Sequence, residues 1–318
     1  MSRPDARPCR AATLLFALIL SALTWAPLPA VSAASSPAWR FQTLKAPPRV
    51  QVLDASGVVA TFTNGARTVN VRGPVRTLAE PGTTSATVTG ATRVRLLPTP
   101  FTGTVDRTWL EAALADSSPD VLALSLQYVA GAPTTLDAAG RVVSGDASYG
   151  PLQPDGTRQE GSDFNDYLGV RWEYDAVADL PEATQLGSLD CSGFVRMVMG
   201  YRSGLAMTLD PDGVRLPRRA HQMLSSAPGR VTVASTGAQP TSTAGLAPGD
   251  LLFFDASTDD GTAVDHVGLY LGVDSTGSAR FISSRKTADG PTLGDVGGRS
   301  TVTGTGHYAR AWRAARRL

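Results

Sequence analysis

A single cysteine beyond the first ten residues is the first candidate for chemistry in this sequence. Cys191 stands in the stretch LDCSGFVRMVMGYRSG (189–204), directly before a run with helical spacing of its apolar residues. A lone cysteine is most often a small buried hydrophobic residue. It can instead be a nucleophile, if a histidine elsewhere in the chain comes to meet it.

A cysteine at the start of a helix has the environment of a nucleophile. The unpaired N–H groups and the helix dipole favour a thiolate there, and a partner imidazolium lowers the thiol pKa further. N–H groups of the same turn can also hold a developing oxyanion. Gly193, two residues further on, allows the backbone of a substrate to come close. We therefore expect Cys191 to be an activated thiolate if a base is available.

Three histidines could be that base. His266 begins the strand-like run HVGLYLGV, so its ring can stand at a sheet edge facing a helix terminus, and it is the preferred partner of Cys191. For His221, on a short helix, and His307, near the end of the chain, a structural role is favoured. A zinc site would need a motif such as CxxC or HxxxH, which the sequence lacks. We expect no metal and no cofactor.

The elements that must position this pair follow from the periodicity of the second half of the chain. A helix is predicted after Asp190, and a shorter one in LPRRAHQMLSS. Strands are predicted at 249–255, 265–273 and 279–285, with a last strand in HYARAWRAARRL. A helix with the thiol, packed on an antiparallel sheet with the histidine, is an α+β arrangement.

The first half of the chain has a different character. Residues 40–105 contain short runs rich in Val and Thr, separated by Gly, Asn and Pro, which predicts a small β-rich module. Residues 106–164 predict a connector of two helical segments, the second capped by Ser118-Pro119, then a hairpin in TTLDAAGRVVSG and a loop. The domain that holds the candidate pair is expected at residues 165–318.

The first 33 residues have the pattern of a signal peptide. A basic start precedes an uncharged, mostly apolar run, Ala11 to Leu23, and Val31-Ser32-Ala33 offers a cleavage site. Cleavage is expected after Ala33, or else after Ala34. Cys9 would leave with this segment, so the mature chain could form no internal disulfide.

Composition excludes several other classes of protein. A formal net charge of +1 gives no reason to expect a nucleic-acid partner. Apolar residues make up 42% of the chain, enough for a packed core. No later stretch approaches the roughly 18 apolar residues of a membrane-spanning helix. The mature protein is expected to be soluble, exported and monomeric, without membrane insertion.

Four motifs follow one another in the second half of the chain: LDCSGFV, LPRRAHQM, GLAPGDLLFF and DHVGLYLG. In this order they resemble the NlpC family of bacterial cell-wall cysteine endopeptidases, and the resemblance covers about residues 165–318. It implies a papain-like α+β domain, secreted to the cell wall. The implied activity is hydrolysis of peptidoglycan stem peptides, typically between γ-D-glutamate and a diamino acid such as meso-diaminopimelate.

The resemblance also assigns roles to individual residues. It implies Cys191 as nucleophile and His266 as base. Asp190 and Ser192 match positions that help to hold the amino end of the stem peptide. Where the family often has a tyrosine, in a GVPY stretch, this sequence reads GVRWEYD. Trp172 stands at the aligned position and Tyr174 is close by, and both are expected to bind substrate.

The resemblance places Ser283 at the position of the family's third catalytic group, which is often a histidine on a strand beyond the base. A serine hydroxyl can accept the imidazole N–H, although it has no charge. A backbone carbonyl or a water molecule could orient the ring instead. Arg285 lies on the same face of the strand two residues further on and could meet a substrate carboxylate.

Two alternatives of other classes remain open at this point. One is an inactive or weakly active cell-wall-binding protein on the same fold. The other is an amidase or acyl transferase, because an acyl-cysteine can pass its acyl group to nucleophiles other than water.

Overall fold

The computed structural model describes residues 38–80, 82, 86–175 and 177–318 of the 318-residue chain. The predicted signal peptide, with its cleavage points after Ala33 and Ala34, lies outside the described residues. Among the helices of the described part, none combines the length and the apolar character that crossing a membrane requires. Contacts join Ala38–Leu318 into one compact unit.

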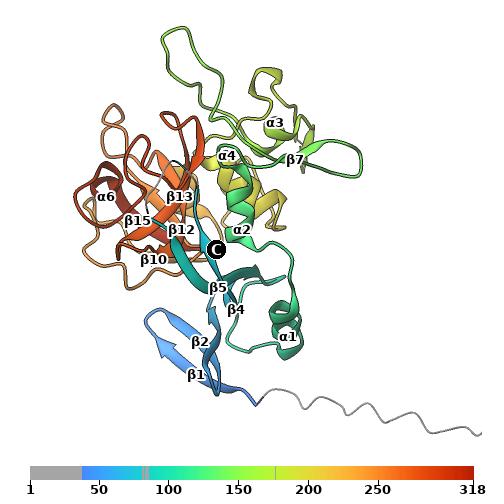
Figure 1. The fold of residues 1–318 in the computed structure, drawn as a ribbon, viewed down its shortest axis with the longest axis vertical. Coiled ribbons are helices and arrows are strands. Elements are labelled where there is room, and N and C mark those ends of the chain that lie inside the picture. Colours follow the sequence, from blue (N-terminus) through green and yellow to red (C-terminus); the bar gives the residue numbers. More distant parts are fainter. Residues whose placement is uncertain (1–37, 81, 83–85, 176) are drawn as a thin grey trace, which may run out of the picture. The chain divides into compact units, whose positions relative to one another are not determined.

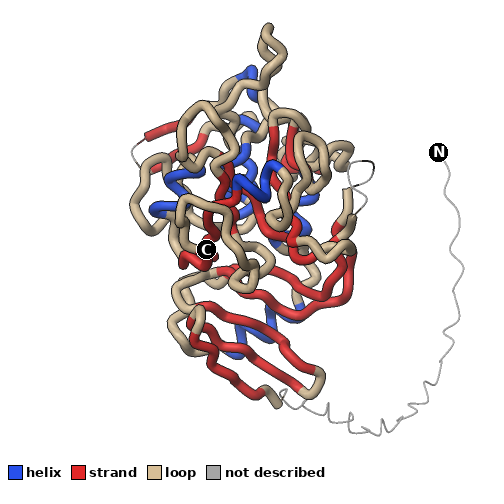
Figure 2. Tube along the Cα trace, turned by 90° about the vertical axis from the view of Figure 1, so that its left-hand side faces the viewer, coloured by secondary structure: helices blue, strands red, loops and turns tan. Residues whose placement is uncertain are grey.

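A five-stranded antiparallel sheet, in the order β1-β2-β3-β4-β5, opens the described chain (Figure 1). Its strands are β1 (Arg40–Lys45), β2 (Pro48–Asp54), β3 (Gly57–Thr63), β4 (Thr68–Leu78) and β5 (Val88–Leu96). In Figure 2, where strands are drawn as red tubes, they lie side by side. Buried residues such as Val52 and Phe62 form a core with Leu110 of α1 (Arg107–Ala115). The β-rich character predicted for residues 40–105 is confirmed.

Hydrogen bonds attach this sheet directly to the end of the chain. The backbone N–H groups of Arg67 and Thr68 donate to the carbonyl of Leu318 at 2.8 and 2.7 Å. Arg317 donates to the hydroxyl of Thr63 at 2.9 Å, in a buried contact. The sheet is therefore packed against the C-terminal half.

The connector holds two short helical elements and a hairpin, as predicted. The helical elements are α1 and α2 (Val121–Ser125), which the 3-10 turn η1 (Leu126–Tyr128) follows, and the hairpin is formed by β6 (Thr135–Leu136) and β7 (Val142–Ser144). The predicted cap of the second helix is wrong. Asp120, rather than Ser118-Pro119, caps α2, because its carboxylate accepts the N–H of Ala123 and also pairs with Arg76.

A six-stranded antiparallel sheet forms the centre of the second half, in the order β10-β15-β11-β12-β13-β14. Its strands are β10 (Arg230–Val233), β11 (Leu251–Phe254), β12 (His266–Val273), β13 (Ala279–Arg285), β14 (Gly290–Thr292) and β15 (Trp312–Arg317). The three central strands are those predicted. The last segment, predicted as one strand, begins instead with a helix, α6 (His307–Ala311), and β15 follows it. The helical turn buries Tyr308, Ala309 and Ala311 together.

The helix predicted after Asp190 is α4 (Cys191–Val195), which continues as the π-helical segment η3 (Arg196–Tyr201). It contacts β12 and β13, and Phe194 and Val195 are fully buried in the core. The remaining elements are α3 (Phe164–Leu168), β8 (Trp172–Tyr174), β9 (Val177–Asp179), η2 (Ala183–Gln185) and α5 (Ala220–Ser226). The predicted mixed α+β arrangement, a thiol-bearing helix on a histidine-bearing sheet, is thus present.

Candidate active site

The first turn of α4 presents Cys191. Asp190 caps the helix, because its carboxylate accepts the backbone N–H of Gly193 at 2.7 Å. The first intrahelical hydrogen bond runs from Phe194 N–H to Asp190 O. The backbone N–H groups of Cys191 and Ser192 precede that bond, so the helix gives them no acceptor. They can donate to a negative oxygen formed beside the thiol.

Gly193 is required by packing within the protein. A Cβ atom at this position would lie 2.2 Å from the carbonyl oxygen of Ser162 and 3.0 Å from Cα of Asp163. The backbone that comes close here therefore belongs to the chain itself, and the expectation that Gly193 makes room for a substrate is wrong.

The thiol lies against the backbone on both sides of His266. Cys191 Sγ is 3.8 Å from the carbonyl oxygen of Asp265, and a hydrogen bond from the backbone of Val267 favours its charged form. His266 is the first residue of β12, and its side chain is buried. The structure thus places the thiol of Cys191 against the start of the strand that bears His266, the residue predicted as base.

Ser283 on the neighbouring strand β13 contacts the imidazole of His266 through Nε2. The distance from His266 Nε2 to Ser283 Oγ is 3.0 Å, and Ser283 is fully buried. The rings of Phe254 and Tyr308 flank the imidazole, with centroid distances of 5.8 and 5.4 Å. When Nε2 donates to Ser283, Nδ1 is the ring nitrogen left to accept the thiol proton.

Burial decides the protonation state of the pair. It raises the pKa of the Cys191 thiol well above its usual value, and the charge of Asp190 acts in the same direction. It lowers the pKa of His266 to about 3, with a further contribution from the charge of Arg285. At pH 7 the pair is therefore a neutral thiol and a neutral imidazole. The thiolate expected from the helix start is not the resting form, because desolvation outweighs the helix dipole.

Arg285 is buried behind the imidazole. Its Nε donates to Ser283 Oγ at 3.1 Å, and its other nitrogens donate to Gly298 O at 2.7 Å and Ser300 Oγ at 2.6 Å. The guanidinium carbon lies 4.2 Å from the ring centroid of Tyr308. Only 2% of the residue is exposed. These contacts favour a role in holding Ser283 over the substrate contact expected from the sequence.

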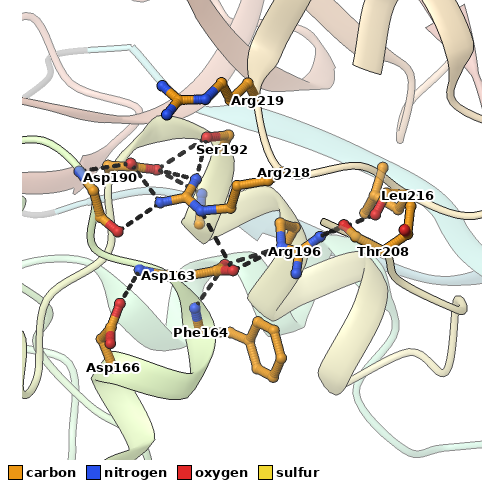
Figure 3. A network of polar contacts seen from close by, with 12 residues as sticks. Asp163, Phe164, Asp166, Asp190, Ser192, Arg196, Thr208, Leu216, Arg218 and Arg219 are labelled. Carbon is orange, nitrogen blue, oxygen red and sulfur yellow. Dashed lines mark hydrogen bonds and ion pairs between the residues drawn. The ribbon is translucent and has the colours of Figure 1, made fainter. Parts of the chain in front are cut away.

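Asp190 and Ser192 are held by Arg218, as Figure 3 shows. Arg218 donates to Asp190 Oδ2 at 2.9 Å and to Ser192 Oγ at 2.7 Å. Ser192 donates in turn to Asp190 Oδ1 at 3.1 Å, and the N–H of Gly161 donates to Oδ2 at 3.1 Å. Although burial acts to raise it, the Arg218 charge keeps the pKa of Asp190 below its ordinary value.

A second buried arginine lies deeper in the same network (Figure 3). Arg196 donates to Asp163 at 2.9 Å and to the carbonyl of Thr208 at 2.7 Å. Its remaining nitrogen bonds the hydroxyl of Tyr174. Asp163 also lies 3.4 Å from Arg218, so this carboxylate joins the two arginines.

Tyr174 is buried beside this network, and Trp172 is half-buried against the core. The Trp172 ring packs against Phe164 and Tyr201, with centroid distances of 4.9 and 6.0 Å. Tyr174 is buried against Arg196. Neither residue lines the cavities beside the thiol and the imidazole.

Two cavities, of about 320 and 310 Å³, lie beside the candidate pair, one lined by Cys191 and the other by His266. The lining of the thiol-side cavity includes Cys191, Ser192, Arg218, Arg219 and His221. The lining of the imidazole-side cavity includes His266, Arg285, Lys286, His307 and Tyr308. Both cavities touch Tyr149, Glu160 and Asp265, so they form two arms of one cleft. His221 and His307, expected to be structural, each line one arm.

Tyr149 is the functional candidate that sequence reasoning missed. It lines both arms, is almost fully buried, and its backbone N–H donates to Asp289 at 3.1 Å. Burial raises the pKa of its hydroxyl, and a charge on Cys191 would raise it further. A protonated hydroxyl therefore lies within electrostatic reach of the thiol. The available signal was a tyrosine in the Gly/Pro-rich loop SYGP.

One acidic cluster among the described residues has the spacing of metal ligands. Carboxylate oxygens of Asp255, Asp260 and Asp265 lie within 4.8 Å of one another. Asp255 pairs with Arg313 at 2.9 Å, and Asp265 accepts two backbone N–H groups. Two of the three carboxylates are thus already engaged within the protein.

A cysteine at a helix start, against a histidine on an antiparallel sheet, is the arrangement of a thiol hydrolase site. Residues 171–290 match the NlpC/P60 family, so the chain contains an NlpC/P60 family domain. Proteins of this family are typically cysteine peptidases of peptidoglycan.

No curated protein matches the chain. A solved structure from Staphylococcus aureus, described as similar to a lipoprotein of the NLP/P60 family, is 22% identical, with a TM-score of 0.25. The match covers 48% of this chain and 38% of that one.

Proposed function

We propose that this protein is an exported, monomeric cysteine peptidase that hydrolyses peptidoglycan stem peptides at the bond between γ-D-glutamate and a diamino acid. Residues 165–318 would be its papain-like domain, 40–105 a β-rich module and 106–164 a connector. The observation that supports it best is the position of Cys191, at the start of α4 and against the backbone that flanks His266.

The geometry supports a covalent mechanism. His266 Nδ1 takes the thiol proton as Cys191 Sγ attacks the scissile carbonyl carbon, and Ser283 accepts the N–H of Nε2. The backbone N–H groups of Cys191 and Ser192 stabilise the oxyanion. The imidazolium then gives its proton to the leaving amine, the C–N bond breaks, and water hydrolyses the thioester.

A binding protein on the same fold is the second candidate. The observation in its favour is the burial of both reactive groups, since only 7% of Cys191 and 8% of His266 is exposed. A binding protein would retain peptidoglycan without cutting it.

The test is digestion of purified peptidoglycan by the wild type, Cys191→Ala and His266→Ala. We expect release of free amines by the wild type, and a loss of several orders of magnitude in each variant and in the double variant alike, as for residues that act as a unit. Mass spectrometry of the products separates an endopeptidase from an amidase or a transferase. Binding without any wild-type cleavage would establish the second candidate.

A further inference from the structure

The groups that the family resemblance assigns to the amino end of the substrate are already engaged. Both carboxylate oxygens of Asp190 accept hydrogen bonds within the protein, from Gly193, Ser192, Arg218 and Gly161. The hydroxyl of Ser192 donates to Asp190 and accepts from Arg218. Arg218, the cation of this network, is engaged by both residues, so a substrate carboxylate needs another cation of the cleft.

The mechanism fixes which arm of the cleft holds which half of the substrate. The imidazolium protonates the leaving amine, so the diamino acid lies on the side of His266. The acyl half stays bonded to Sγ and lies in the opposite arm, which Cys191 and Ser192 line. Under the proposed function this half ends in a γ-linked D-glutamyl residue. Its α-carboxyl group is then the anionic group of the acyl half that lies nearest to the scissile bond.

Most charged groups around the thiol-side arm already have partners. Arg218 pairs with Asp190 at 2.9 Å, and Glu160 pairs with Lys286 at 2.7 Å. Asp265 accepts two backbone N–H groups. Asp260 is exposed in the facing loop and belongs to the acidic cluster described above.

Arg219 is the exception among the cations of this arm. It is exposed, and no ion pair between described residues includes it. In Figure 3 no dashed line joins its guanidinium to the network around Arg218. A guanidinium offers two parallel N–H groups, which a carboxylate can accept with its two charged oxygens. A neutral amide has one oxygen and no negative charge, so it pairs less well.

We propose that Arg219 is a specificity-determining residue that binds the α-carboxylate of the γ-D-glutamyl residue in the thiol-side arm. The assignment rests on the proposed function. It implies a preference for stem peptides with a free α-carboxylate over peptides in which this group is amidated.

The test compares two synthetic stem peptides that differ only in this group, D-glutamate against D-isoglutamine. The ratio of kcat/KM, acid over amide, should exceed one in the wild type and fall about tenfold in Arg219→Gln, the scale of one exposed charge-assisted hydrogen bond. The change should appear in KM more than in kcat. Arg219→Lys, which keeps the charge, should retain part of the preference.

Arg230→Gln is the matched control, because Arg230 is exposed on β10 and lines neither arm of the cleft. It should leave the ratio as in the wild type. If wild type and Arg219→Gln show the same ratio while both peptides are cut, the role of Arg219 is wrong and the peptidase proposal stands. If the wild type cuts neither these peptides nor peptidoglycan, the proposed function itself is wrong.

Discussion

Ser283 places a neutral hydroxyl where a stronger acceptor would hold the imidazole more firmly. Its oxygen already accepts from Arg285, so one lone pair and one proton remain for His266. His266 acts as a base through Nδ1 only when its Nε2–H is donated to that lone pair. Arg285 therefore influences which ring nitrogen carries the proton.

Replacing Ser283 tests this orientation. Ser283→Ala should lower kcat by a factor that corresponds to about 1–2 kcal/mol, the scale of one neutral hydrogen bond. Ser283→His should hold or raise kcat if the strand has room for the ring. Steady-state kinetics on a soluble stem peptide measures both. Ser225→Ala, on the exposed side of α5, is the control. Wild-type constants in Ser283→Ala would place the orienting group elsewhere.

The first turn of α4 shows two opposing effects on one thiol. A helix N-terminus stabilises a nearby negative charge by about 0.3–1 kcal/mol. Removal of the thiol from water acts in the opposite direction and is larger, so the pKa of Cys191 is raised. The neutral state of the pair follows from tertiary packing, which no property of the isolated helix reveals.

Alkylation of Cys191 by iodoacetamide should show whether burial or the helix N-terminus dominates the pKa of the thiol. Only the thiolate reacts, and folding raises the thiol pKa, so the folded protein should label more slowly at pH 8 than the urea-unfolded protein. Its rate should keep rising above pH 9, where the unfolded chain levels off. Mass spectrometry of the labelled peptide gives both rates. Rapid labelling of the folded protein at pH 7 would show an activated pair instead.

The elements around the site could be predicted because their signals are local. The apolar periodicity after Asp190 and the alternation in β12 and β13 identified the helix and both strands. The network of Arg196, Arg218 and Asp163 could not be found in this way. Its members stand far apart in the sequence, and each also reads as an ordinary surface residue. Tyr149 could not be predicted either, because it stands far in the sequence from Cys191 and His266.

At the scale of the whole molecule, the N-terminal sheet contributes to the larger core. The buried cluster that contains Cys191 and Val267, the residue after His266, also contains Leu78, Val88 and Val94 of this sheet. The sequence suggested a separate module because the strand pattern changes to a helical one after residue 105. Periodicity reports which residues are apolar, but it does not report which core receives them.

A chain that starts near residue 120 tests how far the two halves depend on each other. Relative to a chain that starts at residue 38, it should unfold at a lower temperature. Each buried Leu or Val that is lost removes about 1.5–3 kcal/mol. Circular dichroism during heating measures this. If it folds, it should cut soluble stem peptides but bind whole sacculi less well. An unchanged unfolding temperature would show an independent sheet.

The burial of Cys191 also bears on how long the protein stays active in an oxidising medium. Peroxides attack the thiolate far faster than the thiol, and repeated oxidation ends in acids that are not reduced again. Cys191 is the free cysteine of the described chain, so no neighbouring thiol there could trap a sulfenic acid as a disulfide. A sulfur that stays protonated and covered until a substrate reaches it resists this damage. Packing that slows the reaction of the resting thiol with peroxides therefore preserves the residue that we propose as the nucleophile.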